Sequence, residues 1–417
     1  MSRFFYSFIF YLLLPLIFLR LYLRGRKAPA YRERWGERLA LRARPRLDQS
    51  IWIHAVSVGE VLAAVPIIKQ LRQRFPHLPI MLTTMTPTGS DRVKAILGDQ
   101  VNHVYVPYDL PGALSRFYRQ VDPRVLVIME TELWPNMIHY AHKRQVPVIV
   151  ANARLSEKSM KGYARGGSLV RCMLKEIDHL AVQAQADAER FKRLGLPAER
   201  VTITGSVKFD MNVDDQLLQS AQSLKAQWQG RPCVVAASTH AGEDEWVLDA
   251  FTRFKAEFAN AFLILVPRHP ERFDQVAALL EQRCFQYARR STNNIVNSDT
   301  QVLLGDTMGE LVLLMAAGDA VFVGGSLVKT GGHNVLEPIA LGLPTVTGPH
   351  VFNFQTICDS LFAVDGLRQV ESAADLADVW REWLVRRPQQ QIDNASRFLA
   401  ENRGASARQL ALISQYL

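Results

Sequence analysis

The chain has 417 residues, of which 48% are hydrophobic, and its formal net charge is +9. This length predicts two or three domains with sizeable cores, and no low-complexity tract favours disorder. The four cysteines are scattered without a CxxC pair, which excludes a disulfide framework and suits a reducing compartment. Of the histidines, only His139 and His142 lie close together, three apart on a predicted helix, with no acidic or cysteine partner at helical spacing. We therefore predict no metal site.

The positive charge is concentrated in one short stretch. Between residues 20 and 45, nine basic residues stand against Glu33 and Glu37, so this stretch supplies +7 of the total of +9. A nucleic-acid-binding protein usually carries basic residues interleaved with aromatic ones along its body. Here the charge lies beside an apolar segment, and we expect no nucleic-acid partner. The nine basic residues are Arg20, Arg24, Arg26, Lys27, Arg32, Arg34, Arg38, Arg42 and Arg44.

The apolar segment before this stretch has no charge over residues 4–19 and continues to residue 23. A membrane span needs about 20 apolar residues, so the segment is borderline. Its positive charges follow it, which argues against a cleaved signal peptide and places the body on the cytoplasmic side. Both a spanning helix, which we favour, and a helix in the interface with the basic segment on anionic headgroups fit this pattern. We expect residues 1–23 to be a membrane anchor and residues 24–45 a basic juxtamembrane segment.

Strand and helix patterns alternate from residue 51 onward, which is typical of parallel, doubly wound α/β sheets. We predict an N-terminal Rossmann-like domain over residues 46–210, a linker over 211–231, a C-terminal Rossmann-like domain over 232–400 and a final helix over 401–417. Two such domains are expected to face each other across a cleft, with ligands at the carboxyl ends of the strands. The predicted strands are 51–55, 80–84, 104–106, 125–128, 148–150, 181–183 and 201–204 in the first domain, and 234–237, 262–266, 301–304, 320–323 and 344–346 in the second.

The stretch over residues 318–349 carries the clearest ligand-binding pattern. A buried strand leads into a loop with Gly324, Gly325 and two further glycines, and a helix is predicted to begin near His333. Loop N–H groups and the positive end of the helix dipole can hold a phosphate. Glu337, one turn further on, could accept both hydroxyls of a ribose. An ordinary βαβ crossover is the alternative, and we prefer the nucleotide interpretation.

Acidic and basic residues of the first domain follow its predicted strands. Glu60 begins the helix after the first strand, where it could serve as a general base or simply favour the helix start. Glu130 and Glu132 follow the strand 125–128, and we expect Glu130 to face the cleft and Glu132 to cap the next helix. Lys208, a residue type that is usually solvated, lies where the domains meet and could offset charge on a leaving phosphate.

Three loops of the second domain also follow strands. His240 comes after the first strand, and Arg268 comes after the second, where its fork of donors could hold a phosphate oxygen. The segment from Asp306 to Glu310 follows the third and begins a helix. Together these loops predict a nucleotide pocket.

The chain resembles a known family through long motifs in a fixed order. They are HAVSVGE, TTMTPTGS, METELWP, NARLS, TGSVKFD, LVPRHPERF, GDTMGEL and GGSLVKTGGHNVLEP. These are similar to the motifs of bacterial 3-deoxy-D-manno-octulosonic acid (Kdo) transferases, and the similarity runs from the apolar N-terminus to the C-terminal domain.

The resemblance implies a GT-B glycosyltransferase at the cytoplasmic face of the bacterial inner membrane. It would transfer Kdo from CMP-Kdo to the lipid A precursor (lipid IVA) in lipopolysaccharide biosynthesis, with inversion at the anomeric carbon and without a cofactor or metal. Its partners would be CMP-Kdo, the lipid A precursor and the anionic lipids of the inner membrane.

The family's functional residues map onto matching positions of this chain. The resemblance implies that Glu60 is the catalytic base, and that Glu130 and Lys208 support the transition state. It also implies a set of CMP contacts: Arg268, His269, Met308, Gly309, Glu310, Asn334, Val335, Leu336 and Glu337.

Two other functions fit the same sequence. One is a GT-B transferase that uses a UDP-sugar and another membrane acceptor. The other is a non-catalytic, membrane-tethered lipid-binding scaffold that kept the fold.

Overall fold

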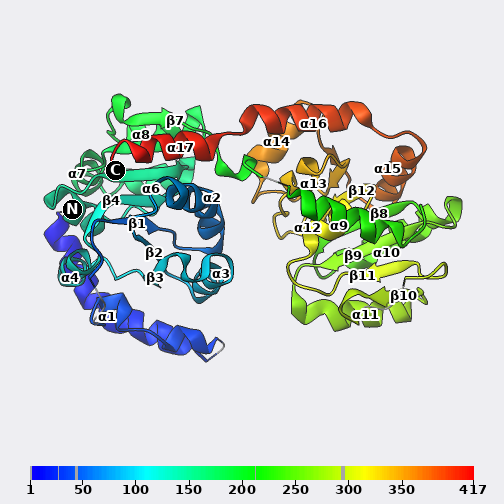
Figure 1. Cartoon of the computed structure of the whole chain (residues 1–417), viewed down its shortest axis with the longest axis horizontal. Helices are drawn as coiled ribbons and strands as arrows, with labels where there is room; N and C mark the ends of the chain where they lie inside the picture. The colour runs from blue at the N-terminus through cyan, green and yellow to red at the C-terminus, as the bar shows by residue number, and fades with distance from the viewer. Residues whose placement is uncertain (1, 27, 43–45, 212, 293–295) are drawn as a thin grey trace. The chain divides into compact units, whose positions relative to one another are not determined.

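The computed structural model describes residues 2–26, 28–42, 46–211, 213–292 and 296–417. Lys27, Arg44 and the boundary of the basic segment at residue 45 lie outside the described residues, as does residue 212 in the predicted linker. The chain divides into two compact units: unit 1 comprises Met1–Asp210 with Arg403–Leu417, and unit 2 comprises Met211–Asn402. Each unit contains one seven-stranded parallel sheet with helices around it (Figure 1).

Unit 1 has the strand order β3-β2-β1-β4-β5-β6-β7. Its strands are β1 (Ser50–His54), β2 (Ile80–Thr84), β3 (Asn102–Tyr105), β4 (Pro123–Met129), β5 (Val148–Ala153), β6 (His179–Val182) and β7 (Val201–Ile203). Its helices are α1 (Arg3–Arg24), α2 (Val58–Arg74), α3 (Pro87–Leu97), α4 (Pro111–Val121), α5 (Pro135–Lys143), α6 (Glu157–Ala164), α7 (Ser168–Lys175), α8 (Gln185–Arg193) and α17 (Ala405–Ser414). Short 3₁₀ turns lie at η1 (Pro29–Arg32), η2 (Glu37–Leu39), η3 (Gly98–Gln100), η4 (Ala198–Arg200) and η5 (Val207–Phe209).

Unit 2 has the strand order β10-β11-β9-β8-β12-β13-β14. Its strands are β8 (Cys233–Thr239), β9 (Phe262–Pro267), β10 (Tyr287–Arg289), β11 (Val302–Leu304), β12 (Ala320–Val323), β13 (Thr345–Thr347) and β14 (Arg368–Gln369). Its helices are α9 (Asp215–Ala226), α10 (Glu243–Glu257), α11 (Phe273–Gln282), α12 (Leu311–Ala316), α13 (Leu336–Ala340), α14 (Gln355–Ala363), α15 (Ala373–Val385) and α16 (Gln389–Asn402), with 3₁₀ turns at η6 (Pro270–Arg272) and η7 (Arg290–Thr292).

The central strands are apolar throughout because helices cover both faces of each sheet. In β1, Trp52 packs in a core with α4, α5 and α7, while Ile51 and Ile53 point into a second core with α2, α3 and α17. Successive side chains of a strand point to opposite faces, so one strand supplies both cores. In unit 2, α10 and α15 pack together over the sheet around Phe254 and Trp380.

All the predicted strands are present, with ends that differ by up to three residues. Two strands were not predicted, β10 and β14, which have three and two residues and form the edges of the second sheet. Such short edge strands bury few side chains and leave no apolar run to recognise. The segment predicted as a linker, 211–231, contains α9 and belongs to unit 2. The final helix, predicted over 401–417, is α17, and it belongs to unit 1.

Helix α1 packs along unit 1 through one of its faces. Near its start, the Asn136 side-chain nitrogen donates to Ser7 Oγ at 3.0 Å. Further along, the ring of Phe18 lies 5.1 Å from that of Trp35, and Leu21 is buried in the same cluster. The opposite face exposes large apolar side chains: Phe4, Phe5, Phe8, Tyr11, Leu12, Leu13, Leu16, Leu19, Tyr22 and Leu23.

Part of the basic segment is used inside unit 1. Glu37 is buried, accepts the N–H of Tyr105 at 3.0 Å and pairs with Arg34 at 2.8 Å. The guanidinium of Arg38, which is 1% exposed, lies 4.3 Å from the Tyr105 ring centre and donates to the Met85 carbonyl at 3.1 Å. These two arginines therefore fasten the segment to β3. Arg20, Arg24, Arg26, Arg32 and Arg42 are exposed.

Asp210 fastens the end of the chain to unit 1. Its carboxylate accepts the N–H groups of Gly404 and Ser406 at the start of α17, the former at 2.6 Å. Helix α17 then buries Ala405, Leu412 and Ile413 in the core that it shares with α2. Figure 1 shows this red helix among the elements of unit 1.

Replacing Asp210 with Ala should destabilise unit 1 because two N–H groups at the start of α17 lose a charged acceptor. Hydrogen bonds to charged groups contribute about 2 kcal/mol, which corresponds to a Tm lower by about 5 °C for a unit of this size. Differential scanning calorimetry measures this change. Asp48→Ala, at an exposed position of the same unit, is the matched control, and equal shifts in the two variants would contradict the assignment.

Candidate active site

Unit 1 gathers polar side chains where its strand order reverses. The chain runs from β1 outward to β3 and then returns to place β4 on the other side of β1. In open α/β sheets, ligands bind at the carboxyl ends of the strands beside such a switch point. Glu60 follows β1 and Glu130 follows β4, so the topology brings these two carboxylates to the same place.

Glu60 is held in a buried site at the start of α2. It is 7% exposed, and its carboxylate accepts the Val56 N–H at 2.7 Å and the Ser57 hydroxyl at 2.9 Å. Burial, together with the nearby charges of Glu132 and Glu130, raises the pKa of Glu60 to about 7, although the two hydrogen bonds oppose this change. A carboxylate with such a pKa can exchange a proton near neutral pH.

Glu130 ends β4 in a left-handed backbone conformation, with φ at 55°. This conformation is uncommon for a residue with a side chain. Its carboxylate is 13% exposed and accepts a hydrogen bond from Arg154 Nε at 2.9 Å. Glu132, expected to cap the next helix, instead accepts the indole N–H of Trp134 at 3.1 Å, and its burial raises its pKa.

Lys208 lies in the turn η5, beside the same group of charges. Burial lowers the pKa of Lys208, the charge of Arg154 lowers it further, and the charge of Glu130 opposes both effects. Unit 1 therefore brings together Glu60, Glu130 and Lys208, the three residues that sequence reasoning selected.

Unit 2 has its own switch point, between β8 and β12. The glycine loop follows β12, and a Cβ atom on Gly324 would lie 2.8 Å from the Ser238 carbonyl oxygen. Only glycine allows the loop to pass this close to the end of β8.

The glycine loop does not offer its N–H groups in the way the sequence suggested. The Glu243 carboxylate, fully buried at the start of α10, accepts the N–H groups of Gly325, Ser326 and Leu327 at 2.6, 2.9 and 2.8 Å. The same carboxylate accepts the His240 N–H at 2.9 Å. The Glu243 carboxylate thus accepts the N–H groups of the glycine loop that were expected to bind a phosphate.

The helix after the loop also differs from the prediction. It begins at Leu336, not near His333, and α13 has only five residues, including Pro338. Of the four residues mapped to this segment, Val335 and Leu336 are buried, while Asn334 and Glu337 are partly exposed. Asn334 Nδ2 donates to Glu337 Oε1 at 3.2 Å, and burial raises the pKa of Glu337.

The other residues mapped to CMP lie at neighbouring strand ends. Arg268 and His269 follow β9 and are exposed. Met308 and Gly309 follow β11 and are exposed as well, whereas Glu310 is paired with Arg290 at 2.8 Å, and this pairing lowers the pKa of Glu310. The strands β11, β9, β8 and β12 are neighbours in that order. These residues and the glycine loop therefore lie side by side at the carboxyl edge of the sheet of unit 2.

Comparisons with known proteins identify the family. A family model described as "3-Deoxy-D-manno-octulosonic-acid transferase (kdotransferase)" matches residues 33–211. The chain is 46% identical to the 3-deoxy-D-manno-octulosonic acid transferase of Haemophilus influenzae over 100% of this chain and 99% of that protein. The chain belongs to the Kdo transferase family. The Kdo transferase of Bordetella pertussis is 35% identical over 97% of each chain. By family, this protein is a glycosyltransferase.

Solved structures agree with the predicted fold class. The structure of Anabaena Alr3699/HepE in complex with UDP is 14% identical and covers 88% of this chain and 100% of that one, with a TM-score of 0.57. The glycotransferase of kitacinnamycin is 13% identical and covers 90% of this chain and 100% of that one, with a TM-score of 0.55. The predicted GT-B class, with two Rossmann-like units and an apolar N-terminal helix, is confirmed.

Sequence reasoning missed several side chains of this candidate site. Arg154 directly follows β5 and pairs with Glu130, and its place in the NARLS motif was the available signal. Glu243 follows Gly242 after the first strand of unit 2, as Glu60 follows Gly59 in unit 1, so the repeated Gly-Glu pair could have revealed it. Nothing in the sequence indicated that His333 contacts His240. In the ranges that the structure describes, no group of three or more His, Cys, Asp or Glu side chains could hold a metal ion.

Replacing Glu243 with Ala should destabilise unit 2 because four N–H groups, of which those of Gly325 and Ser326 are buried, lose their acceptor. We expect a loss of about 3 kcal/mol, since each unsatisfied buried donor is costly, and a smaller loss for Glu243→Gln, which keeps one acceptor oxygen. Chemical denaturation followed by fluorescence measures both. Exposed Glu401 of the same unit provides the control variant Glu401→Gln, and a stability of Glu243→Ala equal to that of the control would rule out the anchoring role.

Proposed function

We propose that this Kdo transferase moves Kdo from CMP-Kdo to a hydroxyl of the lipid A precursor in lipopolysaccharide biosynthesis, with inversion at the anomeric carbon. Glu60 takes the proton of the acceptor hydroxyl as its oxygen attacks that carbon. The bond to the phosphate breaks, and CMP leaves with the bonding electrons. The family and the residues at the two switch points support this reaction.

The environment of Glu60 is the observation that carries the proposal. A sugar hydroxyl is a very weak acid, so its proton must be removed as the new bond forms. A base with a pKa of about 7 is ionised in a large fraction of molecules at neutral pH and is still a stronger proton acceptor than an ordinary carboxylate. Burial and the two neighbouring glutamates supply this property.

Further residues of each unit are assigned to the transition state and to the leaving CMP. Lys208 and Glu130 support the transition state from unit 1, and Arg154 holds the Glu130 carboxylate in place. In unit 2, Arg268 and His269 bind the CMP phosphate, and Met308 through Glu310 together with Asn334 through Glu337 bind the remainder of the nucleotide. Arginine and lysine stabilise charge that develops on a phosphate in the transition state, and the proposed reaction uses no metal.

Glu60→Gln should abolish transfer, because the amide cannot accept the proton, while the protein still binds CMP. General base catalysis contributes about 100-fold or more, so kcat should fall by at least that factor. The wild-type rate should rise about tenfold per pH unit below pH 7 and level off above it, since ionised Glu60 is the active form. Mass spectrometry of the product formed from CMP-Kdo and lipid IVA measures both effects.

The control for this experiment is Glu199→Gln, which changes an exposed glutamate of unit 1. It should retain the wild-type rate and pH profile. A Glu60→Gln protein that transfers Kdo at the wild-type rate would refute the base assignment, and a wild-type protein without transfer would favour the scaffold function.

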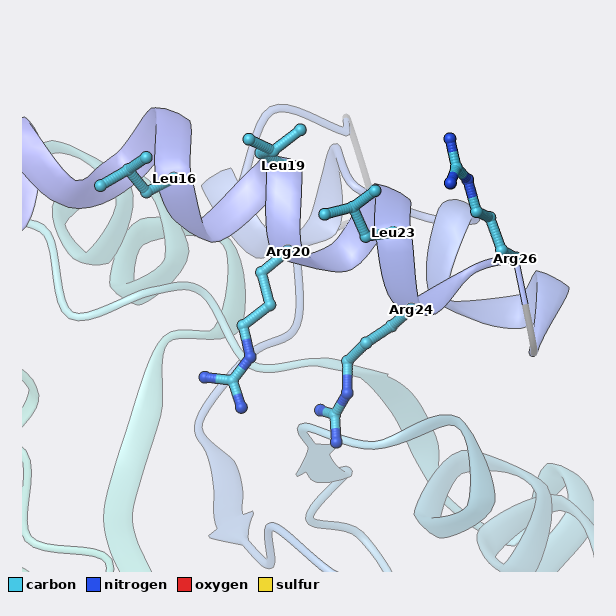
Figure 2. Close-up of a pocket in the computed structure, with 6 residues that line it drawn as sticks. All are labelled: Leu16, Leu19, Arg20, Leu23, Arg24 and Arg26. Carbon is cyan, nitrogen blue, oxygen red and sulfur yellow. The ribbon is translucent and has the colours of Figure 1, made fainter.

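We further propose that α1 attaches the enzyme to the cytoplasmic side of the inner membrane by lying in the plane of the interface. Among the described residues, α1 is the one helix long and apolar enough to cross a membrane. Its packing on unit 1 from Ser7 to Leu21 supports the in-plane alternative, because a spanning helix would have to leave that surface. Figure 2 shows that the side chains of Leu16, Leu19 and Leu23 extend from one side of α1 and those of Arg20 and Arg24 from another. These five residues and Arg26 line a pocket. Leucines in the acyl region beside arginines at phosphate headgroups are typical of such helices.

The two membrane arrangements place the N-terminus on different sides. In a Ser2→Cys protein, an in-plane helix leaves the new thiol on the same side as the exposed Cys284 of unit 2. A membrane-impermeant maleimide should then label both of these cysteines, together with the exposed Cys172, in inside-out vesicles and none of them in intact spheroplasts. Peptide mass analysis separates the labelled sites. Labelling of Ser2→Cys in spheroplasts alone, with Cys284 labelled only in inside-out vesicles, would establish a spanning helix.

A further inference from the structure

Two histidines meet at the switch point of unit 2. His240 directly follows β8, and His333 follows the glycine loop after β12. Their Nε2 atoms lie 2.8 Å apart, and their rings are within 10° of parallel. At this distance one Nε2 must donate a proton to the other, so the two rings share a single hydrogen between them. The family comparison assigns no role to either residue.

The pair is held by the surrounding structure. A Cβ atom on Gly325 would lie 2.9 Å from His333 Cδ2, so the ring occupies the space that this glycine leaves. The carboxylate of Glu243 accepts the backbone N–H of both His240 and Gly325. The buried Glu243 carboxylate therefore fixes the backbone of His240 and that of Gly325, against which the His333 ring lies. The surrounding structure thus holds the two rings in contact.

The neighbours whose charges act on the pair are Arg268, Arg272 and His269. His269 lies edge-on to His240, with ring centres 5.1 Å apart. Burial, together with the charges of Arg268, His240 and His269, lowers the pKa of His333 to about 4. Burial also lowers the pKa of His240, and the charges of His269, Arg272 and Arg268 act in the same direction.

The acidic groups around the pair are already occupied. Asp244, buried on α10, accepts the Thr239 hydroxyl at 2.6 Å and is paired with Arg272. The Glu243 carboxylate accepts hydrogen bonds from the N–H groups of the glycine loop, and the Glu337 carboxylate on α13 accepts one from Asn334 Nδ2. The exposed Glu271 carboxylate lies 4.0 Å from His269 Nδ1 and is directed to that ring. Arg268, His269 and the pair itself are therefore the groups that can face an incoming anion.

We infer that the His240–His333 pair binds the phosphate of a nucleoside monophosphate and takes up one proton as it does so. Without a ligand, the neighbouring cations and burial keep the pair neutral. A phosphate dianion reverses the sign of the local field, so a proton added to the pair is stabilised and the pair becomes a cation. This inference rests on the proposed function for the identity of the ligand.

The inference also gives the pair a part in transfer. A phosphodiester donor carries one negative charge on its phosphate, and the phosphate gains a second when its bond to the sugar breaks. The bonding electrons stay on the phosphate oxygen, and the proton of the acceptor hydroxyl goes to Glu60. The protonated pair remains beside the phosphate and stabilises the second charge.

Calorimetric titration of the full-length protein with CMP tests the inference directly. At pH 7.5, titrations in buffers of different ionisation enthalpy should show an uptake of about one proton per CMP bound. CMP itself contributes little, because the second pKa of a phosphate monoester is about 6. The same linkage predicts that the Kd for CMP increases about tenfold per pH unit around pH 7.5.

Variants locate the proton. His240→Gln and His333→Gln should each bind CMP with almost no proton uptake, whereas His77→Gln, at an exposed position of unit 1, should behave as wild type. Undiminished uptake in His333→Gln, or no uptake in the wild type, would overturn the inference.

A second measurement needs no variant at the pair. Selective ¹⁵N-histidine labelling of the wild-type protein reports ring protonation by NMR, and CMP should protonate one histidine equivalent while cytidine, which has no phosphate, should protonate none. An equal response to cytidine would also overturn the inference. Because no acceptor is present, these results do not depend on transfer: proton uptake without Kdo transfer would refute only the proposed function, and transfer without uptake would refute only the role of the pair.

Discussion

A buried carboxylate at the start of the helix after the first strand is the constraint on which both units depend. Glu60 and Glu243 each follow a glycine, and each accepts the N–H of a residue that precedes its helix. Their surroundings then differ. Glu243 receives four N–H groups, three of them from the glycine loop, so its charge is fully used in holding that loop. Glu60 receives one N–H and one hydroxyl and has two glutamates nearby. The same local geometry therefore holds a carboxylate that four N–H groups engage in one unit and, in the other, a carboxylate whose pKa is raised to about 7.

This difference shows what sequence reasoning can say of such residues: it predicts where they lie in the fold, but not which partners they contact. Apolar runs and their spacing are enough to predict the strands, and strand order then requires that Glu60, Glu130 and Arg268 lie at carboxyl edges. Strand order predicts where in the fold a side chain lies, but not which other residue it contacts. The amides of the glycine loop were expected to be open to a phosphate, yet a residue more than 80 positions earlier, Glu243, reaches them. The contact between His240 and His333 joins two loops in the same way. Pairings of this kind depend on tertiary packing, for which a single sequence gives no periodic signal.

The net charge of the basic segment likewise does not predict which of its arginines are buried and which are exposed. Its formal charge of +7 suggested a single surface for anionic lipids. In the structure, Arg38 is buried on the Tyr105 ring and Arg34 is paired with Glu37, so these two charges stabilise the attachment of the segment to β3. The other described arginines, at the end of α1 and beyond it, remain exposed. A buried arginine and an exposed one are indistinguishable in composition, and only the aromatic ring and the carboxylate beside the buried one tell them apart.

The path of the chain through the two units has a consequence for biosynthesis. Unit 2 is an insertion within unit 1, and helix α17 of unit 1 is synthesised after the whole of unit 2. The core around α2 therefore stays open on one side until α17 has been made, although most of its strands are made first. Unit 2 has all of its residues earlier and can close its own core while the nascent chain is still tethered. The half of the enzyme that is synthesised first is thus the half that matures last, and chaperones would encounter its unfinished apolar surface throughout that interval.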